Sequence, residues 1–245
     1  MRDTDNFALC IERDGFAVVS TCVSSGSVEK LTRDIELLGA TVDLGARGGV
    51  RNAFRRLPTL PHLAVTAPMW TLASSVLGPD CAAVRAIVFD KTPGANWKVS
   101  WHQDLTIAVR ERREAPGFGP WSTKAGIQHV QPPVSILERM LTLRLHLDPC
   151  GLDNGPVRVL PGSHRASRLT GTAIDDWRER AQEHSCLADR GDILAMRPLL
   201  LHASSPSTSP HHRRVIHIEY AGTDLPHGLE WFEAWRPPDI GNAAA

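Results

Sequence analysis

The chain has 245 residues, of which 42% are hydrophobic, and its 27 Lys and Arg residues balance 27 Asp and Glu residues to a formal net charge of zero. This balance argues against a nucleic-acid-binding protein or a polybasic membrane anchor, and no apolar run approaches the ~18 residues of a membrane span. The five cysteines are scattered without CxxC spacing, which argues against a disulfide framework or a thiolate zinc site, so we expect a cytoplasmic, reduced protein.

The first third of the chain predicts helices. Apolar residues recur at helical spacing over residues 25–39, where Ser25 or Ser27 can act as the N-cap and Gly39 can end the helix. A second helix is predicted within residues 66–78, which a Gly-Pro pair would stop. The stretch that precedes the first helix ends in a short apolar run that is typical of a strand.

After about residue 80 the pattern changes to short β-type runs separated by turn signals. These runs are residues 82–91, 98–109, 140–148, 157–162, 191–204 and 213–222. Many short strands after a helical start predict an antiparallel barrel or sandwich with helices packed outside. We therefore expect one domain over residues 1–245 that is mostly β with flanking helices, its helical part covering about residues 1–80 and its core about residues 81–222.

One long segment, residues 110–135, is rich in proline and glycine and lacks a clear strand pattern. A loop of this length usually carries a function, and this one leaves the run that holds His102 and Asp104. We interpret it as an irregular lid that is poorly ordered until ligands bind. The charged run at 110–114 is interpreted as a solvated face, and His129 as a loop residue without a ligand role.

His102 and Asp104 stand two residues apart in a run that otherwise has the pattern of a strand. Successive side chains of a strand alternate between faces, so these two are expected to lie side by side. They are either a structural hydrogen-bonded pair or two ligands of a metal site. His202, at the end of another apolar run, is a candidate third ligand. Two histidines and one carboxylate can bind Fe(II) on one face and leave three positions open, whereas zinc typically keeps one open position.

The predicted strand that begins at Arg213 divides its side chains between two faces. Arg213, Val215, His217 and Glu219 share one face, which suits a polar barrel interior, and the apolar side chains of the other face suit packing against helices. If the iron uses a 2-oxo acid, the far carboxylate of that acid needs a fixed cation. Arg213, together with Ser204, could supply it, because a guanidinium binds a carboxylate through two parallel hydrogen bonds.

Three segments of the sequence resemble the phytanoyl-CoA dioxygenase family of Fe(II)/2-oxoglutarate oxygenases. They are WHQDLTI at residues 101–107, DNGPVRVLPGSHRASRL at residues 153–169, and the stretch of residues 191–220. The family keeps its cosubstrate arginine eleven residues after the distal histidine, a spacing that selects Arg213 rather than Arg214. The resemblance implies a double-stranded β-helix core, also called a jelly-roll or cupin-like fold, with flanking helices.

The resemblance also implies a site. Fe(II) is expected at His102, Asp104 and His202, with 2-oxoglutarate and O2 as cosubstrates. Arg144 stands at a place that lines the cosubstrate pocket and is commonly aromatic in the family. Arg51 is the best candidate for a basic residue upstream of the barrel that reaches the cosubstrate in some relatives, and a solvated surface arginine is the alternative for that residue.

Our main hypothesis is therefore an oxygenase that hydroxylates a C–H bond of a small polar metabolite or natural-product intermediate. The interior positions Arg144, His146, His217 and Glu219 suggest a polar or charged substrate. One alternative is a non-catalytic metal-binding barrel with a structural or sensing role. Another is a zinc hydrolase on a cupin-like barrel, which would leave the arginine of the last strand without a function. Substrate identity and oligomeric state are not determined by the sequence.

Overall fold

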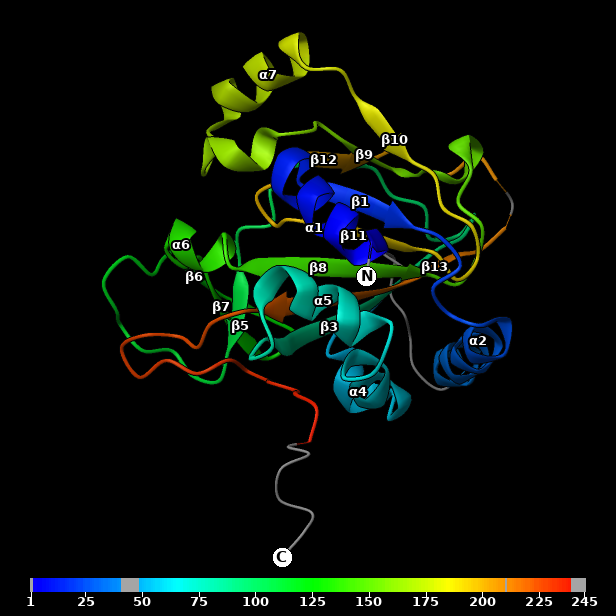
Figure 1. The fold of residues 1–245 in the computed structure, drawn as a ribbon, viewed down its shortest axis with the longest axis horizontal. Helices are drawn as coiled ribbons and strands as arrows, with labels where there is room; N and C mark the ends of the chain where they lie inside the picture. The colour runs from blue at the N-terminus through cyan, green and yellow to red at the C-terminus, as the bar shows by residue number, and fades with distance from the viewer. Residues whose placement is uncertain (1, 41–48, 210, 239–245) are drawn as a thin grey trace, which may run out of the picture.

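The structure is a computed structural model that describes residues 2–40, 49–209 and 211–238 (Figure 1). Its helices are α1 Arg2–Asp14, α2 Ser25–Gly39, α3 Ala53–Arg56, α4 Thr59–Ala64, α5 Met69–Leu77, α6 Val134–Leu137 and α7 Gly171–Arg180, with short 3-10 turns at Leu152–Asn154 and Ser163–Ala166. Its strands are β1 Phe16–Val19, β2 Gly49–Val50, β3 Ala82–Lys91, β4 Val99–His102, β5 Ile107–Val109, β6 Trp121–Lys124, β7 Ile127–Val130, β8 Met140–His146, β9 Val157–Val159, β10 His184–Cys186, β11 Ile193–Met196, β12 His202–Ser204 and β13 Arg213–Ala221.

These strands form three sheets within the described ranges. The main sheet has the strand order β1-β11-β8-β13-β3-β2, the minor sheet β10-β9-β12-β4, and the side sheet β5-β7-β6. Every neighbouring pair is antiparallel. Between β8 and β13 the chain passes repeatedly from the main sheet to the minor sheet and back, so these two sheets form the walls of a barrel. The prediction of a mostly β fold with flanking helices is confirmed.

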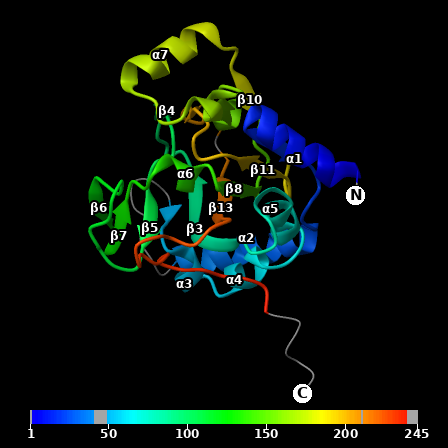
Figure 2. The same cartoon turned by 60° about the vertical axis from the view of Figure 1, so that its left-hand side comes forward.

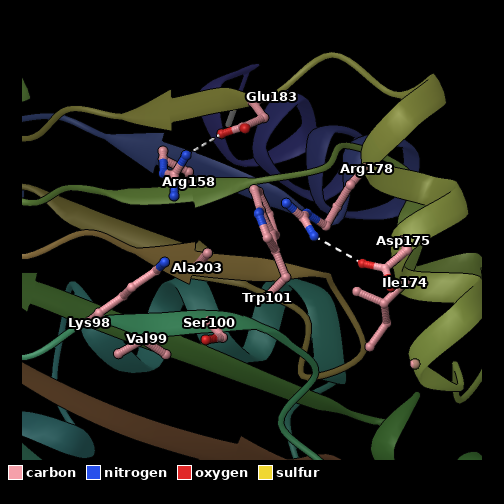
Figure 3. Close-up of a pocket in the computed structure, with 11 residues that line it drawn as sticks. Lys98, Val99, Ser100, Trp101, Arg158, Ile174, Asp175, Arg178, Glu183 and Ala203 are labelled. Atoms are coloured by element: carbon pink, nitrogen blue, oxygen red, sulfur yellow. Dashed lines mark hydrogen bonds and ion pairs between the residues drawn. The ribbon is translucent and has the colours of Figure 1, made fainter.

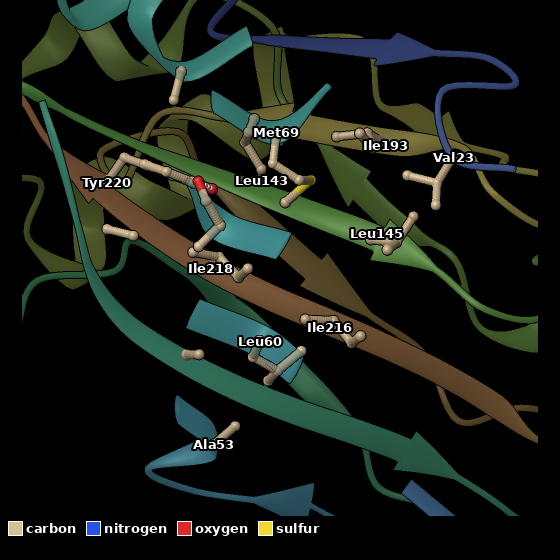
Figure 4. Packing of buried hydrophobic residues seen from close by; sticks show 14 of the residues in the cluster. Val23, Ala53, Leu60, Met69, Leu143, Leu145, Ile193, Ile216, Ile218 and Tyr220 are labelled. Carbon is tan, nitrogen blue, oxygen red and sulfur yellow. Dashed lines mark hydrogen bonds between the residues drawn. The ribbon is translucent and has the colours of Figure 1, made fainter. Parts of the chain in front are cut away.

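The largest apolar cluster packs helices against the outer face of the main sheet (Figure 4). Strand β13 shows why: Ile216, Ile218 and Tyr220 are fully buried in this cluster, while the alternate residues of the strand face the barrel interior. The hydroxyl of Tyr220 donates to the carbonyl of Ala64 at 2.9 Å, so the phenol is satisfied inside the apolar layer. This alternation leaves the interior face of β13 available for polar residues.

The N-terminal part of the chain contributes more than helices. Strands β1 and β2 extend the main sheet at its two ends, pairing with β11 and β3. The sequence did not reveal α1, and the N-cap of α2 is Ser24, whose side chain accepts from the backbone N–H of Ser27, rather than Ser25 or Ser27. The helix predicted within residues 66–78 is found as α5. Within the described ranges, no helix combines the length and apolarity needed to cross a bilayer.

The expectation of an irregular segment over residues 110–135 is wrong. This segment contains β6 and β7, a hairpin whose turn residues Ala125 and Gly126 both have positive φ, and β7 pairs with β5. His129 is buried in β7 instead of lying in a loop. Strands of four residues are too short for their alternation to stand out from the surrounding prolines and glycines. The charged run at 110–114 is exposed, as predicted.

Candidate active site

The three predicted metal ligands come together in the structure. His102 is the last residue of β4 and lies opposite His202, the first residue of β12, in the register of the minor sheet. Asp104 follows in a loop, where its backbone N–H donates to the carbonyl of Pro198 at 2.8 Å. The Nε2 atoms of both histidines lie 3.6 Å from the Asp104 carboxylate. One ligand atom from each of the three residues thus lies within 4.8 Å of the others.

The cause of this convergence differs from the predicted one. Residues 98–109 do not form one strand, because β4 ends at His102 and β5 begins at Ile107. Asp104 therefore reaches His102 through a loop whose path is set by the contact with Pro198, rather than by the alternation of a strand.

Both histidines present the same ring nitrogen to Asp104. The Nδ1 atom of His102 lies 2.9 Å from the carbonyl of Ser100, and that of His202 lies 2.9 Å from the carbonyl of Leu200. Since a carbonyl can only accept, each neutral ring carries its hydrogen on Nδ1 and keeps a free lone pair on Nε2. Metal-binding histidines in proteins almost always donate their other N–H in this way. The donor set therefore fits a divalent metal.

The electrostatics of the triad favour the metal-binding forms of His202 and Asp104. Burial lowers the pKa of His202 to about 4, which keeps that ring neutral. Burial opposes ionisation of Asp104, but electrostatic interactions with His202 and His102 outweigh it and hold the pKa of the carboxyl below its usual range. Burial would also lower the pKa of His102, yet hydrogen bonding and charge from Asp104 raise it. An ionised carboxylate and a neutral imidazole are the forms that bind metals.

A cavity of about 110 Å³ adjoins the triad. Besides the three ligands it is lined by Phe89, Trp97, Val99, Arg144, Val157, Ala203, Ser204, Arg213 and His217. Arg144 and Arg213 are 9% and 3% exposed, and the Nε atom of each lacks a hydrogen-bond partner in the described part of the chain. The described lining contains one carboxylate, that of Asp104. Buried guanidinium groups without a carboxylate partner fit an anionic ligand, and 2-oxoglutarate is a dianion.

Sequence reasoning missed a third cation beside this cavity. Lys91, the last residue of β3, is fully buried and lies opposite Arg213 in the main sheet. Its Nζ donates to the hydroxyl of Ser204 at 2.9 Å and to the carbonyl of Ser205 at 2.6 Å, and lies 5.3 Å from the ring of Trp97. Burial, followed by the charge of Arg213, lowers the pKa of Lys91 to about 7. The available signal was that Lys91 shares the strand face of Arg85, on which the two intervening residues are apolar.

Of the remaining predicted residues, Ser204 lies in the cavity wall and Arg51 does not. Ser204 is buried, and its hydroxyl lies 3.0 Å from the carbonyl of Gly155, which also accepts from Arg213. Arg51 follows β2, is exposed, and is not one of the described lining residues. Its charge lowers the pKa of Lys124 after burial and the charge of Arg85. Its contact with a cosubstrate stays a prediction.

The polar interior residues that suggested a polar substrate mostly contact one another. Arg144 Nη1 donates to His217 Nδ1 at 2.9 Å, and His217 Nε2 lies 3.2 Å from the Glu219 carboxylate. Glu219 in turn forms a buried ion pair with Arg85 of β3. His146 is buried, and neither of its ring nitrogens has a partner among the described residues. Arg144, His217, Glu219 and Arg85 thus form a chain of contacts across the interior, and Arg144 and His217 also line the triad cavity.

Two further cavities lie along β4, the edge strand of the minor sheet. One, of about 360 Å³, is lined by residues 97–102 and shares Trp97, Val99 and His102 with the triad cavity. The other, of about 380 Å³, lies between the outer face of β4 and α7, with the Trp101 side chain at its centre (Figure 3). In two views α7 stands apart from the other helices, at the end of the molecule that holds the minor sheet (Figure 2). The cavity of residues 97–102 therefore adjoins the triad cavity at the β4 edge.

Two facing antiparallel sheets, a two-histidine-one-carboxylate triad and a buried arginine beside it define the class of mononuclear-iron, 2-oxo-acid-dependent oxygenases with a double-stranded β-helix. The comparison with family models agrees: the phytanoyl-CoA dioxygenase (PhyH) model matches residues 11–215. The chain therefore belongs to the phytanoyl-CoA dioxygenase family, whose members are iron- and 2-oxoglutarate-dependent oxygenases. This confirms the family and the cofactors that the sequence predicted.

Named relatives are distant. The iron/alpha-ketoglutarate-dependent dioxygenase ausU of Aspergillus calidoustus is 24% identical over 221 residues, which cover 87% of this chain and 69% of that protein. Apo EctD from S. alaskensis superposes with a TM-score of 0.70 at 20% identity, covering 95% of this chain and 84% of that one. The epimerase SnoN with Fe3+, alpha ketoglutarate and nogalamycin RO gives a TM-score of 0.67 at 17% identity, covering 97% and 96%. At these identities the structures show a shared fold.

Gly155, whose carbonyl accepts from both Ser204 and Arg213, is expected to tolerate no side chain. Its φ is +58°, and a Cβ would lie 2.5 Å from the carbonyl oxygen of Ser205. Gly126 has φ +78° with nothing within 4 Å of such a Cβ, so Gly126→Ala isolates the backbone penalty, about 1 kcal/mol. We expect Gly155→Ala to lose roughly 1–3 kcal/mol more free energy of unfolding in urea than Gly126→Ala. Equal losses would show that the close approach is not a constraint.

Proposed function

We propose that this protein is an Fe(II)- and 2-oxoglutarate-dependent oxygenase that hydroxylates a C–H bond of a small polar molecule, with His102, Asp104 and His202 as its iron ligands. The observation that carries the proposal is that this triad shares one cavity with buried arginines that form no ion pair with a described residue. Family membership supports the same chemistry. Iron with bound cosubstrate would supply the oxidation that replaces hydrogen by hydroxyl at carbon.

The protein's own side chains position the ligands and keep water out. The carbonyls of Ser100 and Leu200 hold the rings of the two ligand histidines, so that each Nε2 faces the metal position. Arg213, Lys91 and Ser204 form a cluster that is proposed to bind the distal carboxylate of 2-oxoglutarate through charge-assisted hydrogen bonds. Burial of this cluster makes those bonds stronger than they would be in water.

A small polar substrate is supported by the cavity along β4. Its wall combines the aromatic faces of Trp97 and Trp101 with the polar side chains of Lys98 and Ser100. Solved structures of similar fold hold small molecules: 5-hydroxyectoine in EctD and nogalamycin RO in SnoN. SnoK and SnoN are named a carbocyclase and an epimerase, so this fold also hosts outcomes other than hydroxylation. Placement of the substrate's C–H bond decides among these outcomes.

We also propose that the protein works in a reducing compartment, such as the cytoplasm. All five cysteines are free, and Cys81, Cys150 and Cys186 among them are buried. Burial raises the pKa of the Cys186 thiol to about 12, which keeps it in its unreactive form.

The triad is tested by metal affinity. His202→Ala should lower Fe(II) affinity by at least about a hundredfold, because it removes one of three protein ligands and leaves the remaining two with water. His102→Ala and Asp104→Ala should do the same. Anaerobic calorimetric titration measures this, and His211→Ala, which alters an exposed histidine, is the control. Near-normal affinity in any triad variant would remove that residue from the ligand set. Absence of succinate formation by the iron-loaded protein in oxygen would favour a non-catalytic barrel.

The cosubstrate cation is tested by comparing neighbouring arginines. Arg213→Ala should leave iron binding intact but weaken 2-oxoglutarate binding more than about tenfold, since a buried carboxylate loses a charge-assisted contact. Arg214 faces the helix side, where it pairs with Asp148 and Glu36, so Arg214→Ala should alter stability and not cosubstrate affinity. Anaerobic titration of the iron-loaded variants measures both. Similar losses in the two would contradict the assignment of faces.

Lys91 should make cosubstrate affinity depend on pH. Its pKa in the free protein is lowered to about 7, and a bound dianion favours the protonated amine. Above pH 7 binding must therefore take up a proton, so 2-oxoglutarate affinity should fall by up to about tenfold per pH unit as pH rises, and stay level below pH 7 as far as this group contributes. In Lys91→Met the fall of 2-oxoglutarate affinity with rising pH should disappear. An unchanged slope in that variant would assign it to another group.

A further inference from the structure

Arg144 occupies an unusual place in the pocket. It lies on β8 with its Cα opposite that of His217, whereas Arg213 lies opposite Lys91. His217 and Arg213 are four residues apart on β13, about 13 Å along a strand. The Cα atom of Arg144 therefore lies far along the barrel from those of Arg213 and Lys91, which belong to the proposed distal-carboxylate cluster. The resemblance to the family leads one to expect an aromatic side chain here, which would offer packing but no charge.

A buried chain of contacts fixes the Arg144 guanidinium. Because a guanidinium only donates, His217 accepts on Nδ1 and must carry its hydrogen on Nε2, which points to Glu219. Glu219 is held from its other side by Arg85. The His217 ring also makes a T-shaped contact with the ring of Phe89, with the two centroids 5.6 Å apart. The contacts thus run from the Arg144 cation through the neutral His217 ring to the Glu219 anion and the Arg85 cation. Each side chain limits the positions that its neighbour can take.

The remaining donors of Arg144 are available to a ligand. Its Nε atom is buried without a hydrogen-bond partner in the described part of the chain, and the side chain lines the same cavity as the three metal ligands. The Arg144 side chain adjoins both the triad and Arg213 in the cavity lining, and its contact with His217 holds it at the level of that residue on β13. Burial lowers the pKa of Arg144 to about 10, so the group stays a cation at neutral pH.

We propose that Arg144 binds the metal-chelating C1 carboxylate of the 2-oxo acid, that Arg213 binds the distal carboxylate, and that Glu219, acting through His217, is a positioning residue for Arg144. The inference rests on the proposed function. A 2-oxo acid that chelates through its keto oxygen and one carboxylate oxygen leaves the second carboxylate oxygen free to accept hydrogen bonds. Arg144 is the cation of the described cavity lining that is not part of the Arg213 cluster. Two carboxylates are thus matched by two separately held guanidinium groups.

The test separates the two carboxylates by using two acids. 2-Oxoglutarate and 2-oxopentanoate have the same carbon chain, and the second carries a methyl group in place of the distal carboxylate. Affinities are measured anaerobically on the Fe(II)-loaded protein by calorimetry and by the visible absorption that a chelated 2-oxo acid gives. Arg144→Met should weaken both acids by the same factor, about tenfold or more, and leave their ratio unchanged. Arg213→Met should weaken the binding of 2-oxoglutarate alone. The ratio of 2-oxoglutarate affinity to 2-oxopentanoate affinity should therefore fall.

Conservative variants test the positioning role. Arg144→Lys should bind both acids more tightly than Arg144→Met does, because lysine restores the positive charge but not the paired hydrogen bonds of a guanidinium. Glu219→Gln, which keeps the shape and removes the charge, should weaken both acids equally, by less than Arg144→Met does. Iron affinity should be unchanged in all of these variants, and that value also reports that the barrel is folded.

Results that would overturn the inference about Arg144 differ from results that would overturn the proposed function. A ratio that collapses in Arg144→Met would assign Arg144 to the distal carboxylate, and unchanged affinities for both acids would leave it a structural residue. Either result overturns the inference while the proposed function stands. Failure of the iron-loaded wild-type protein to bind 2-oxoglutarate would instead overturn the proposed function itself. If Glu219→Gln changes neither affinity, Glu219 is not a positioning residue.

Discussion

Buried positive charge is the constraint on which the rest of this structure depends. Removing an ion from water costs several kcal/mol even after relaxation, unless a partner of opposite charge is present. The barrel nevertheless buries Lys91, Arg144 and Arg213 in or beside one cavity, and the described lining of that cavity includes one carboxylate, that of Asp104. A metal dication adds to this charge, and a dianionic cosubstrate offsets it. The cluster is therefore understandable as a site completed by its ligands.

The antiparallel register of three strands makes this burial possible. On β13 and β3, polar interior residues alternate with apolar residues that pack under the helices, so the cations enter the barrel without breaking the apolar layer outside it. The register also separates them, with Arg213 opposite Lys91 and Arg144 opposite His217. Separation along the strands would allow two guanidinium groups to bind different ends of one small molecule, as proposed for Arg144 and Arg213. The carbonyl of Gly155 accepts one hydrogen bond from Arg213, and the carbonyl of Ser205 accepts one from Lys91.

Proteins that differ widely in sequence share the fold of this chain. Solved structures at 15–22% identity keep the fold, with TM-scores of 0.64–0.70, and their names include a carbocyclase and an epimerase. In this chain the candidate metal triad lines one cavity with Arg213 and Ser204, and His102 also lines the cavity along β4. Arg213 and Ser204 are buried in the barrel, whereas the cavities along β4 are bordered by β4 and α7, where changes disturb the core least.

The sequence by itself determined the fold class, the family and the residues of the candidate metal site. It could do so because metal ligation demands particular residue types, and because alternation along β13 is a local property that separates Arg213 from Arg214. Local spacing also predicted α2 and α5, which were found. The tertiary structure alone decided which side chains complete the site. Lys91 joins it through the pairing of β3 with β13, and Asp104 meets His102 through a loop held by Pro198. The partners of Arg144 and the side sheet over residues 110–135 likewise depend on strands distant in sequence, and such long-range pairings leave no periodicity in any one segment from which they could be inferred.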